Sequence, residues 1–248
     1  MSPSRRVYDV PVKTGALFLA AWLVALAGFV LMAILAASND TFPADIWLAH
    51  RIQDCDIAAI DRALDWTEDG IDAPVVVLAC AVAASLLLVA RDGLGALLEI
   101  TATAGRPLTT WAAKELIQRP RPSAELVEFH DQPSSFSFPS GHAESAMILY
   151  GLIFYFAALY ISNLWLRSGI QAVCVWIVVA GGFERVYAGH HWPSDVLGGY
   201  YLGALMLSGI IIIHRLVIAL RQTVTPPPSR SFSTATPAAG RGAGRRET

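Results

Sequence analysis

Long runs of apolar residues constrain this chain more than any other feature of its sequence. Six such runs can be recognised, and most approach the roughly 20 residues that a helix needs to cross a bilayer. They cover residues 16–37, 73–90, 93–113, 145–166, 168–183 and 196–213. Because backbone polar groups in lipid must be satisfied within their own segment, each run is expected to form a helix. The sequence therefore predicts an all-α, polytopic membrane protein with six transmembrane helices.

The composition agrees with a membrane protein. Hydrophobic residues make up 54% of the 248 residues and charged residues only 15%, whereas about a quarter of an average globular protein is charged. The net charge of −2 gives no reason to expect nucleic acid as a partner. The three cysteines, Cys55, Cys80 and Cys174, have no paired spacing. Neither a disulfide framework nor a metal-ligand motif is therefore expected.

The first apolar run has an alternative interpretation as a secretory signal peptide. Arg5, Arg6 and Lys13 precede it, and residues 35–38, Leu-Ala-Ala-Ser, resemble a cleavage site. However, its apolar core exceeds the roughly 7–15 residues usual for signal peptides. A retained transmembrane span is the favoured interpretation.

Six spans place both termini on one side of the membrane, and the charges indicate which side. The segments on that side carry eleven basic and three acidic residues, against six basic and sixteen acidic residues in the loops on the opposite side. By the positive-inside rule, both termini are predicted to be cytoplasmic. The protein is therefore expected in the inner (plasma) membrane. Its loop 38–72 then faces outward, and the mix of Trp47, Ile57, Ile60, Leu64 and Trp66 suggests a short interfacial helix there.

The chain is expected to divide into three parts. Residues 1–15 form a cytoplasmic N-terminal segment, and residues 16–220 form one six-span domain. Residues 221–248 form a basic tail rich in Pro, Ser, Gly and Arg. Such a composition predicts disorder.

Three polar clusters fall at the outer ends of these predicted spans. They cover residues 114–122, 139–142 and 185–195. They are far apart in the sequence, yet a compact bundle would bring them together on one face.

The first two clusters offer groups that suit an anion. Lys114, Arg119 and Arg121 are three cations near the end of the third run, and arginine's planar fork matches phosphate oxygens. Ser140 and Gly141 mark a helix start, where free backbone amides bind anions. An N-cap role would explain Ser140 equally well, but it does not explain His142. Lys114, for its part, could instead snorkel to the interface.

The third cluster holds Arg185, His191 and Asp195. Asp195 follows His191 by four residues, so its carboxylate can orient one ring nitrogen and leave the other free to attack. That is the arrangement of a nucleophile with its orienting group. Taken together, the three clusters suit a phosphate group without a required metal or other cofactor.

At this point the chain resembles the type 2 phosphatidic acid phosphatase family. The three-part signature is carried by Lys114 with Arg121-Pro122, by Pro139 to His142, and by Arg185 with His191 and Asp195, in this order and spacing. The resemblance implies the helical bundle core that this family shares with haloperoxidases. It also implies a membrane phosphatase that needs no metal and acts on the outer face.

The resemblance also implies a role for each residue. His191 would attack phosphorus and form a phosphohistidine, with Asp195 orienting it and His142 protonating the leaving oxygen. The residues that would hold the phosphate oxygens are Lys114, Arg121, Ser140, Gly141 and Arg185. The implied substrate is a lipid phosphate in the bilayer: polyprenyl diphosphate such as undecaprenyl diphosphate, phosphatidylglycerol phosphate or phosphatidate. A lipid phosphotransferase, or a lipid-binding or transport protein without catalysis, remains an alternative.

Four further residues need comment. Glu184 stands where the family often has serine, and it is expected to pair with Arg185. Arg119 lies outside the signature and is expected at the rim of the site. Glu99 and Arg106 interrupt the third run seven residues apart, and ionisable groups inside a bilayer usually pair. They are therefore predicted to form a structural ion pair.

Overall fold

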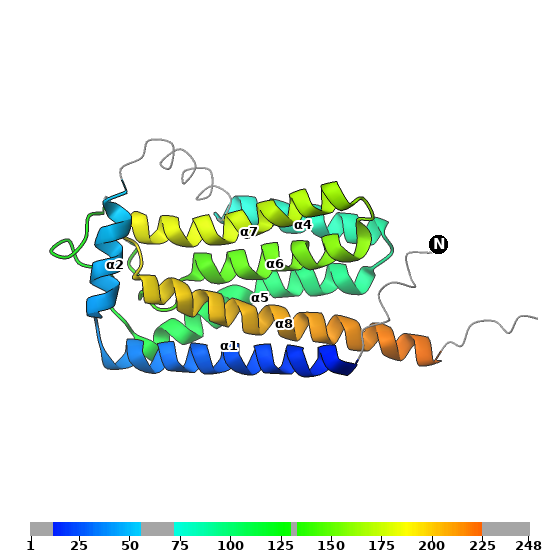
Figure 1. The fold of residues 1–248 in the computed structure, drawn as a ribbon, viewed down its shortest axis with the longest axis horizontal. Coiled ribbons are helices and arrows are strands. Elements are labelled where there is room, and N and C mark those ends of the chain that lie inside the picture. The colour runs from blue at the N-terminus through cyan, green and yellow to red at the C-terminus, as the bar shows by residue number, and fades with distance from the viewer. Residues whose placement is uncertain (1–11, 56–71, 130–132, 225–248) are drawn as a thin grey trace, which may run out of the picture.

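The computed structural model describes residues 12–55, 72–129 and 133–224, and the regular structure in these ranges is helical (Figure 1). The helices are α1 (Val12–Ser38), α2 (Pro43–Gln53), α4 (Ala73–Val89), α5 (Gly93–Ile117), α6 (Gly141–Tyr160), α7 (Leu164–Tyr187) and α8 (Pro193–Val224). The prediction of an all-α protein is thus confirmed for the described part of the chain.

Each predicted apolar run corresponds to one long helix, and the largest boundary differences are at the ends of α6 and α8. The predicted run 145–166 continues past Tyr160, where α6 ends. Asn163 explains the break, because its side chain accepts a hydrogen bond from Leu166 N and so caps the start of α7. At the other end of the chain α8 continues to Val224, so the first four residues of the predicted tail are helical. Residues 225–248 lie outside the described ranges.

Not all of these helices are long and apolar enough to be membrane spans by composition. α6, α7 and α8 qualify, and α1 qualifies together with α2 as a pair bent by 100°. α4 is apolar but has only 17 residues. The described residues therefore support three spans, or four with the bent pair, and the arrangement with six spans stays a prediction.

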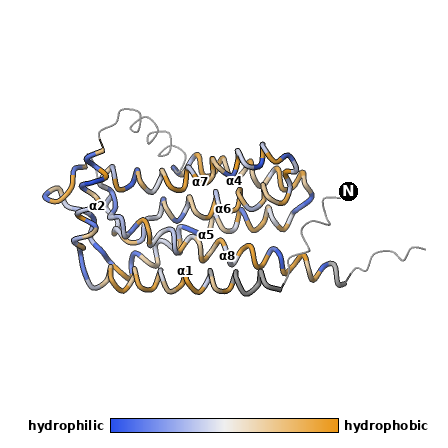
Figure 2. The backbone as a smooth tube through the Cα atoms, viewed as in Figure 1, coloured by the Kyte–Doolittle hydropathy of each residue, from blue (hydrophilic) through white to orange (hydrophobic). Residues whose placement is uncertain are grey.

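α6 is the central helix of the bundle. It packs against α8, α7 and α5, while α1 lies along α8 and α4 along α5 (Figure 1). One buried core cluster joins α4 to α6 through Ala84, Leu87, Ile148, Leu152 and Phe156. Hydrophobic residues run along the helices and hydrophilic residues gather toward the bundle ends (Figure 2). Polar chemistry is thereby concentrated where helices begin and end.

α2 crosses one end of the bundle instead of running along it (Figure 1). It follows α1 after the sharp bend and packs on α7 and α8. It contains Trp47, from the segment where a short interfacial helix was predicted, but residues 56–71 lie outside the described ranges. The end that α2 covers holds the candidate site.

The predicted ion pair between Glu99 and Arg106 is wrong. Glu99 is fully buried, and neither carboxylate oxygen has a hydrogen-bond partner within the described residues. Arg106 donates instead from Nη1 to the carbonyl of Gly141, 3.1 Å away. Seven residues are about two helical turns, or roughly 10 Å along the axis. The start of α6 offers Arg106 an acceptor closer than Glu99.

Candidate active site

Four helix ends meet under α2. α5 and α7 end there, and α6 and α8 begin there (Figure 1). Lys114 lies in the last turn of α5, Ser140 caps α6, Arg185 lies in the last turn of α7, and Asp195 lies in the first turn of α8. The fold therefore brings to one end of the bundle the three clusters that the sequence separates.

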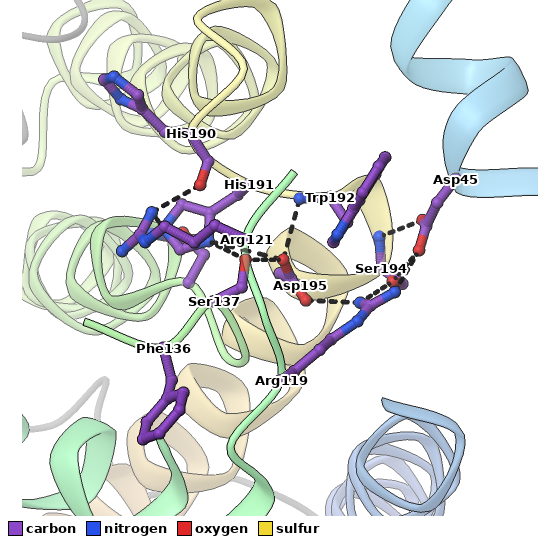
Figure 3. A network of polar contacts seen from close by, with 12 residues as sticks. Asp45, Arg119, Arg121, Phe136, Ser137, His190, His191, Trp192, Ser194 and Asp195 are labelled. Carbon is purple, nitrogen blue, oxygen red and sulfur yellow. Dashed lines mark hydrogen bonds and ion pairs between the residues drawn. The ribbon is translucent and has the colours of Figure 1, made fainter. Parts of the chain in front are cut away.

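Asp195 is fully buried at the centre of this network (Figure 3). Its Oδ1 accepts a hydrogen bond from Arg119 Nη1 at 2.6 Å, and its Oδ2 accepts from the backbone amide of Trp192 at 2.9 Å. Ser137 Oγ also donates to Oδ2. Both carboxylate oxygens are thus held by donors, which stabilise the charged form inside the protein.

His191 is 3% exposed and faces Asp195. Its Nδ1 lies 3.7 Å from Asp195 Oδ2, too far for a direct hydrogen bond, and 3.4 Å from Ser137 Oγ. Its Nε2 lies 3.4 Å from Arg121 Nη1. Asp195 and Ser137 both lie beside Nδ1, and the orientation of the ring by Asp195 stays a prediction. One ring nitrogen faces the carboxylate and the other faces the cations.

Burial lowers the pKa of His191 to about 4, against an ordinary value of 6.5. The nearby cations Arg121 and Lys114 act in the same direction, whereas Asp195 opposes them. The imidazole is therefore neutral near pH 7, so the lone pair on its unprotonated ring nitrogen is available for attack.

Lys114 and Arg121 are both held by the segment before α6. Lys114 Nζ lies 3.4 Å from Ser135 Oγ and also donates to the carbonyl of Phe136. Arg121 Nε donates to the carbonyl of Ser135 at 2.8 Å, and Nη1 donates to the carbonyl of His190 at 2.5 Å. Burial lowers the pKa of Arg121 from its ordinary value. Arg121 is thus held next to Nε2 of His191, and Lys114 is held by the same segment before α6.

Arg185 is buried and bonded to its neighbour in the chain. Its Nε donates to Glu184 Oε2, which confirms the predicted pairing of these two residues. The carbonyl of Arg185 accepts hydrogen bonds from the amides of His190 and His191, each at 3.1 Å. The end of α7 therefore fixes the backbone that carries the twin histidines.

Ser140 and Gly141 join the start of α6 to its neighbours. The Ser140 hydroxyl accepts from the amide of Ala143, so it serves as the N-cap, and its own amide donates to the carbonyl of Asp195 at 3.0 Å. A Cβ on Gly141 would lie 3.2 Å from Thr110 Cγ2 on α5. Both residues are thus explained structurally, and a contact with phosphate remains a proposal.

His142 begins α6 in a more open position than His191. Its side chain is 38% exposed, and its Nε2 lies 3.9 Å from Asp72 Oδ1. Behind it, the fully buried Glu144 accepts hydrogen bonds from Thr109, at 2.7 Å, and Thr110. His142 therefore stands at the edge of the buried network, where a substrate oxygen could reach it.

Two members of this network were missed from the sequence. Arg119, expected at the rim, is only 1% exposed and bonds Asp195 directly, so that expectation is wrong. Pro120 and Pro122 flank Arg121, and this irregular segment has no periodicity from which a side-chain direction can be deduced. Ser137 lies in the irregular connection between α5 and α6, and no sequence spacing singles it out. The doubled Arg-Pro of residues 119–122 is the one sequence feature that could have drawn attention to Arg119.

The charges of the arrangement suit an anion. Within the described residues, no group of three or more His, Cys, Asp and Glu side chains is positioned to hold a metal. Lys114, Arg121 and Arg185 instead supply positive charge around a neutral imidazole. Such a site can bind a phosphate group and present it to a nitrogen nucleophile.

Comparison with known proteins agrees with this chemistry. The family model described as PAP2 superfamily matches residues 94–218, just over half of the chain. Phosphatidylglycerophosphatase B of Bacillus subtilis is 43% identical over 101 residues, which are 38% of this chain and 45% of that protein. An undecaprenyl-diphosphatase of Sulfolobus acidocaldarius is 34% identical over 76 residues, 29% of this chain and 31% of that protein. The matched part of the chain thus spans less than half the length of these curated relatives.

Two solved structures share the fold. One is the transmembrane PAP2 type phosphatidylglycerolphosphate phosphatase from Bacillus subtilis, with a TM-score of 0.65 and 25% identity, covering 78% of this chain and 96% of that chain. The other is LpxE of Aquifex aeolicus, with a TM-score of 0.51 and 22% identity over 73% of this chain and 98% of that chain. The second likeness concerns the fold alone.

Proposed function

The chain belongs to the PAP2 superfamily, and from this premise we propose that it is an integral membrane lipid phosphatase that works through a phosphohistidine on His191. The observation that carries the proposal is the placement of His191. Its Nδ1 faces Asp195 and Ser137, while its Nε2 lies beside Arg121. A neutral imidazole held in this way is a nitrogen nucleophile aimed at an anion site.

The proposed reaction proceeds in two displacement steps at phosphorus. Nε2 of His191 attacks the terminal phosphorus of the lipid, the bond from phosphorus to the lipid-side oxygen breaks, and His142 donates a proton to that oxygen. Water then attacks the phosphohistidine and gives a proton to His142. The phosphorus–nitrogen bond breaks, and inorganic phosphate leaves.

The remaining residues stabilise charge during both steps. Lys114, Arg121 and Arg185 neutralise the phosphate oxygens, and the amides at the start of α6, near Ser140 and Gly141, add backbone donors. Asp195 stabilises the cationic ring that forms when Nε2 bonds to phosphorus.

The proposed substrates are phosphorylated lipids that reach the site from the bilayer. Polyprenyl diphosphate is proposed first, followed by phosphatidylglycerol phosphate and phosphatidate. The first two are the substrates named for the relatives. From the charge asymmetry of the loops, the site is proposed to face the outer side of the membrane.

The test is phosphate release by protein purified in detergent from each of the three lipids in parallel. His191→Ala is expected to lower the rate by about 10²-fold or more, because the nucleophile is removed. His190→Ala is the matched control, since His190 contributes its backbone carbonyl to Arg121 and alanine keeps that carbonyl. It is expected to stay within about threefold of the wild type, well below the effect of removing a reacting group.

Two results would contradict the proposal. One is phosphate release by the wild type no faster than by His191→Ala on all three lipids. The other is phosphate transferred to an added alcohol acceptor with little free phosphate, which would identify a phosphotransferase.

A further inference from the structure

Arg119 is a cation removed from solvent in a place where phosphate cannot be its partner. Its side chain is 0% exposed, and protein atoms hold all three of its nitrogens. Nε donates to the carbonyl of Asp40 at 3.2 Å, Nη1 to Asp195 Oδ1 at 2.6 Å, and Nη2 to Asp45 Oδ2 at 2.8 Å. A buried charge is costly unless it is paired and hydrogen-bonded. The pairing with two carboxylates meets that requirement.

Asp45 anchors this arginine from α2. It is 4% exposed, and its Oδ1 accepts from the amide of Ser194 at 2.9 Å while its Oδ2 accepts from the Ser194 hydroxyl at 2.5 Å. The Ser194 hydroxyl in turn accepts from Arg119 Nη1 at 2.6 Å. Asp45 therefore ties three things together: α2, the first turn of α8 and the guanidinium of Arg119.

Arg119 and Arg121 serve opposite sides of the catalytic pair. Figure 3 shows Arg121 on the His190 side of Asp195, and Arg119 on the Asp45 side. Arg121 Nη1 lies 3.4 Å from His191 Nε2, where a phosphate would be attacked. Of the two carboxylate oxygens of Asp195, Arg119 contacts only Oδ1, which faces away from His191. Its position is thus behind Asp195, away from the proposed substrate.

We propose that Arg119, anchored by Asp45 on α2, is a positioning residue that holds the Asp195 carboxylate and, through it, the orientation and charge balance of His191. The catalytic part of this inference rests on the proposed function. Arg119 occupies Oδ1, so Oδ2 stays with Ser137 and Trp192 N and keeps facing His191 Nδ1. Without Arg119, Oδ1 loses its charged donor, and only the hydrogen bonds from Ser137 and Trp192 N to Oδ2 oppose rotation of the carboxylate about its Cβ–Cγ bond.

The arrangement extends the catalytic machinery beyond the family region. The family match begins at residue 94, whereas α2 covers Pro43–Gln53. Because α2 packs on α7 and α8, it can hold Arg119 in register with the two helices that carry Arg185 and Asp195. α2 is therefore part of the support of the site as well as its cover.

The test compares Arg119→Gln, Arg119→Lys and Asp45→Asn in kcat, KM and the pH profile of kcat/KM, with one lipid substrate throughout. Arg119→Gln is expected to lower kcat by about 10²-fold, as loss of alignment typically does, with KM within about threefold. Arg119→Lys is expected to recover part of the loss because it restores the charge. Arg51→Gln on the exposed side of α2 is the matched control, since it removes one arginine charge from the same end of the bundle.

The pH profile distinguishes a positioning role of Arg119 from a general loosening of the protein structure. The groups around Asp195 and His191 are the cations Arg119, Arg121 and Lys114 and the hydroxyl of Ser137. Removing the Arg119 cation makes protonation of His191 and Asp195 easier, so the acid limb moves to higher pH in Arg119→Gln. Removing the Asp45 anion acts oppositely, so the limb moves to lower pH in Asp45→Asn. Shifts of the same sign in both variants, or no shift, would overturn the proposal.

A second readout is independent of activity. The titration of His191 is followed by NMR of protein labelled with ¹⁵N-histidine in detergent, with His191→Gln used to assign the signal. Its midpoint is expected to rise in Arg119→Gln and to stay unchanged in Arg51→Gln. If the wild type releases no lipid phosphate but this midpoint rises, the proposed function fails and the positioning role stands. An unchanged midpoint, or a rise in KM without a fall in kcat, would refute the positioning role. Should Arg119→Gln fail to fold, Arg119→Lys and Asp45→Asn decide.

Discussion

His190 and His191 are adjacent in the chain but have different surroundings. His191 is buried against Asp195 and Ser137, whereas the side chain of His190 is partly exposed. The carbonyl of Arg185 holds both backbone amides, and this turn of chain directs the His191 ring toward Asp195 and the His190 ring away from it (Figure 3). The difference between two identical residues thus arises from the backbone at the end of α7.

Burial of His191 predicts a dependence of stability on pH. Its pKa in the folded protein is about 4, below the ordinary 6.5, so between these values the unfolded chain binds a proton that the folded chain does not. Stability is therefore lost as the pH falls from 6.5 to about 4. The full pKa difference corresponds to a loss of about 3 kcal/mol in the free energy of unfolding at the low end of that window.

Thermal unfolding in detergent at several pH values between 7 and 4 measures this effect. The wild-type Tm is expected to fall more steeply than that of His191→Gln, because glutamine has no proton to gain. Titrating groups away from His191 act equally in both proteins and cancel in the comparison. Parallel curves for the two proteins would show that His191 does not titrate in the predicted window.

At the scale of elements, the close approach of α8 to the start of α6 holds the site together. A Cβ on Gly199 would lie 2.4 Å from the carbonyl oxygen of Ser140 and 3.0 Å from Ala143 Cβ. Both neighbours belong to the turn that presents Ser140 and Gly141. Only glycine therefore fits this contact at position 199.

Gly199→Ala is predicted to push the two helices apart. The shift breaks the hydrogen bond from Ser140 N to the carbonyl of Asp195 and is expected to cost about 1–3 kcal/mol, the usual range for overpacking. Gly209→Ala on the same helix is the matched control, because a Cβ there meets nothing within 4 Å. Unfolding temperature and phosphate release should fall together in the first variant and stay near wild type in the second. Equal behaviour of both variants would contradict this account of the packing.

On the scale of the whole molecule, the predicted topology divides charge unequally between the two sides of the membrane. The predicted cytoplasmic segments carry eleven basic residues against three acidic ones. Arg91, in the link between α4 and α5, and Arg167, in the first turn of α7, belong to the end opposite α2. The active-site end is therefore the one that the positive-inside rule places outside the cytoplasm.

This orientation can be tested in intact cells. A fluorescent reporter that matures only in the cytoplasm, fused after Val224, is expected to fluoresce. A cysteine introduced at the exposed Ala124, in a background with Cys55 replaced, is expected to react with a maleimide that does not cross the membrane. Protection of Ala124 until the cells are lysed would reverse the assigned orientation.

The sequence by itself determined the helical segments and the local spacing of the site. Apolar runs predict helices because lipid leaves the backbone no other partner. The distances from Arg185 to His191 and from His191 to Asp195 are short enough along the chain to be set locally. The pairing of Glu184 with Arg185 was predictable for the same reason.

Only the tertiary structure decided which polar groups meet across the bundle. Arg119 reaches Asp195 across 76 residues and Asp45 across 74, and Ser137 reaches Asp195 across 58. These contacts depend on how α2, α8 and the irregular connection between α5 and α6 pack, and no periodic pattern encodes the direction of a loop side chain. Helix packing also explains why the predicted pairing of Glu99 with Arg106 is wrong. Arg106 took an acceptor on α6 that was invisible until the helices were packed together.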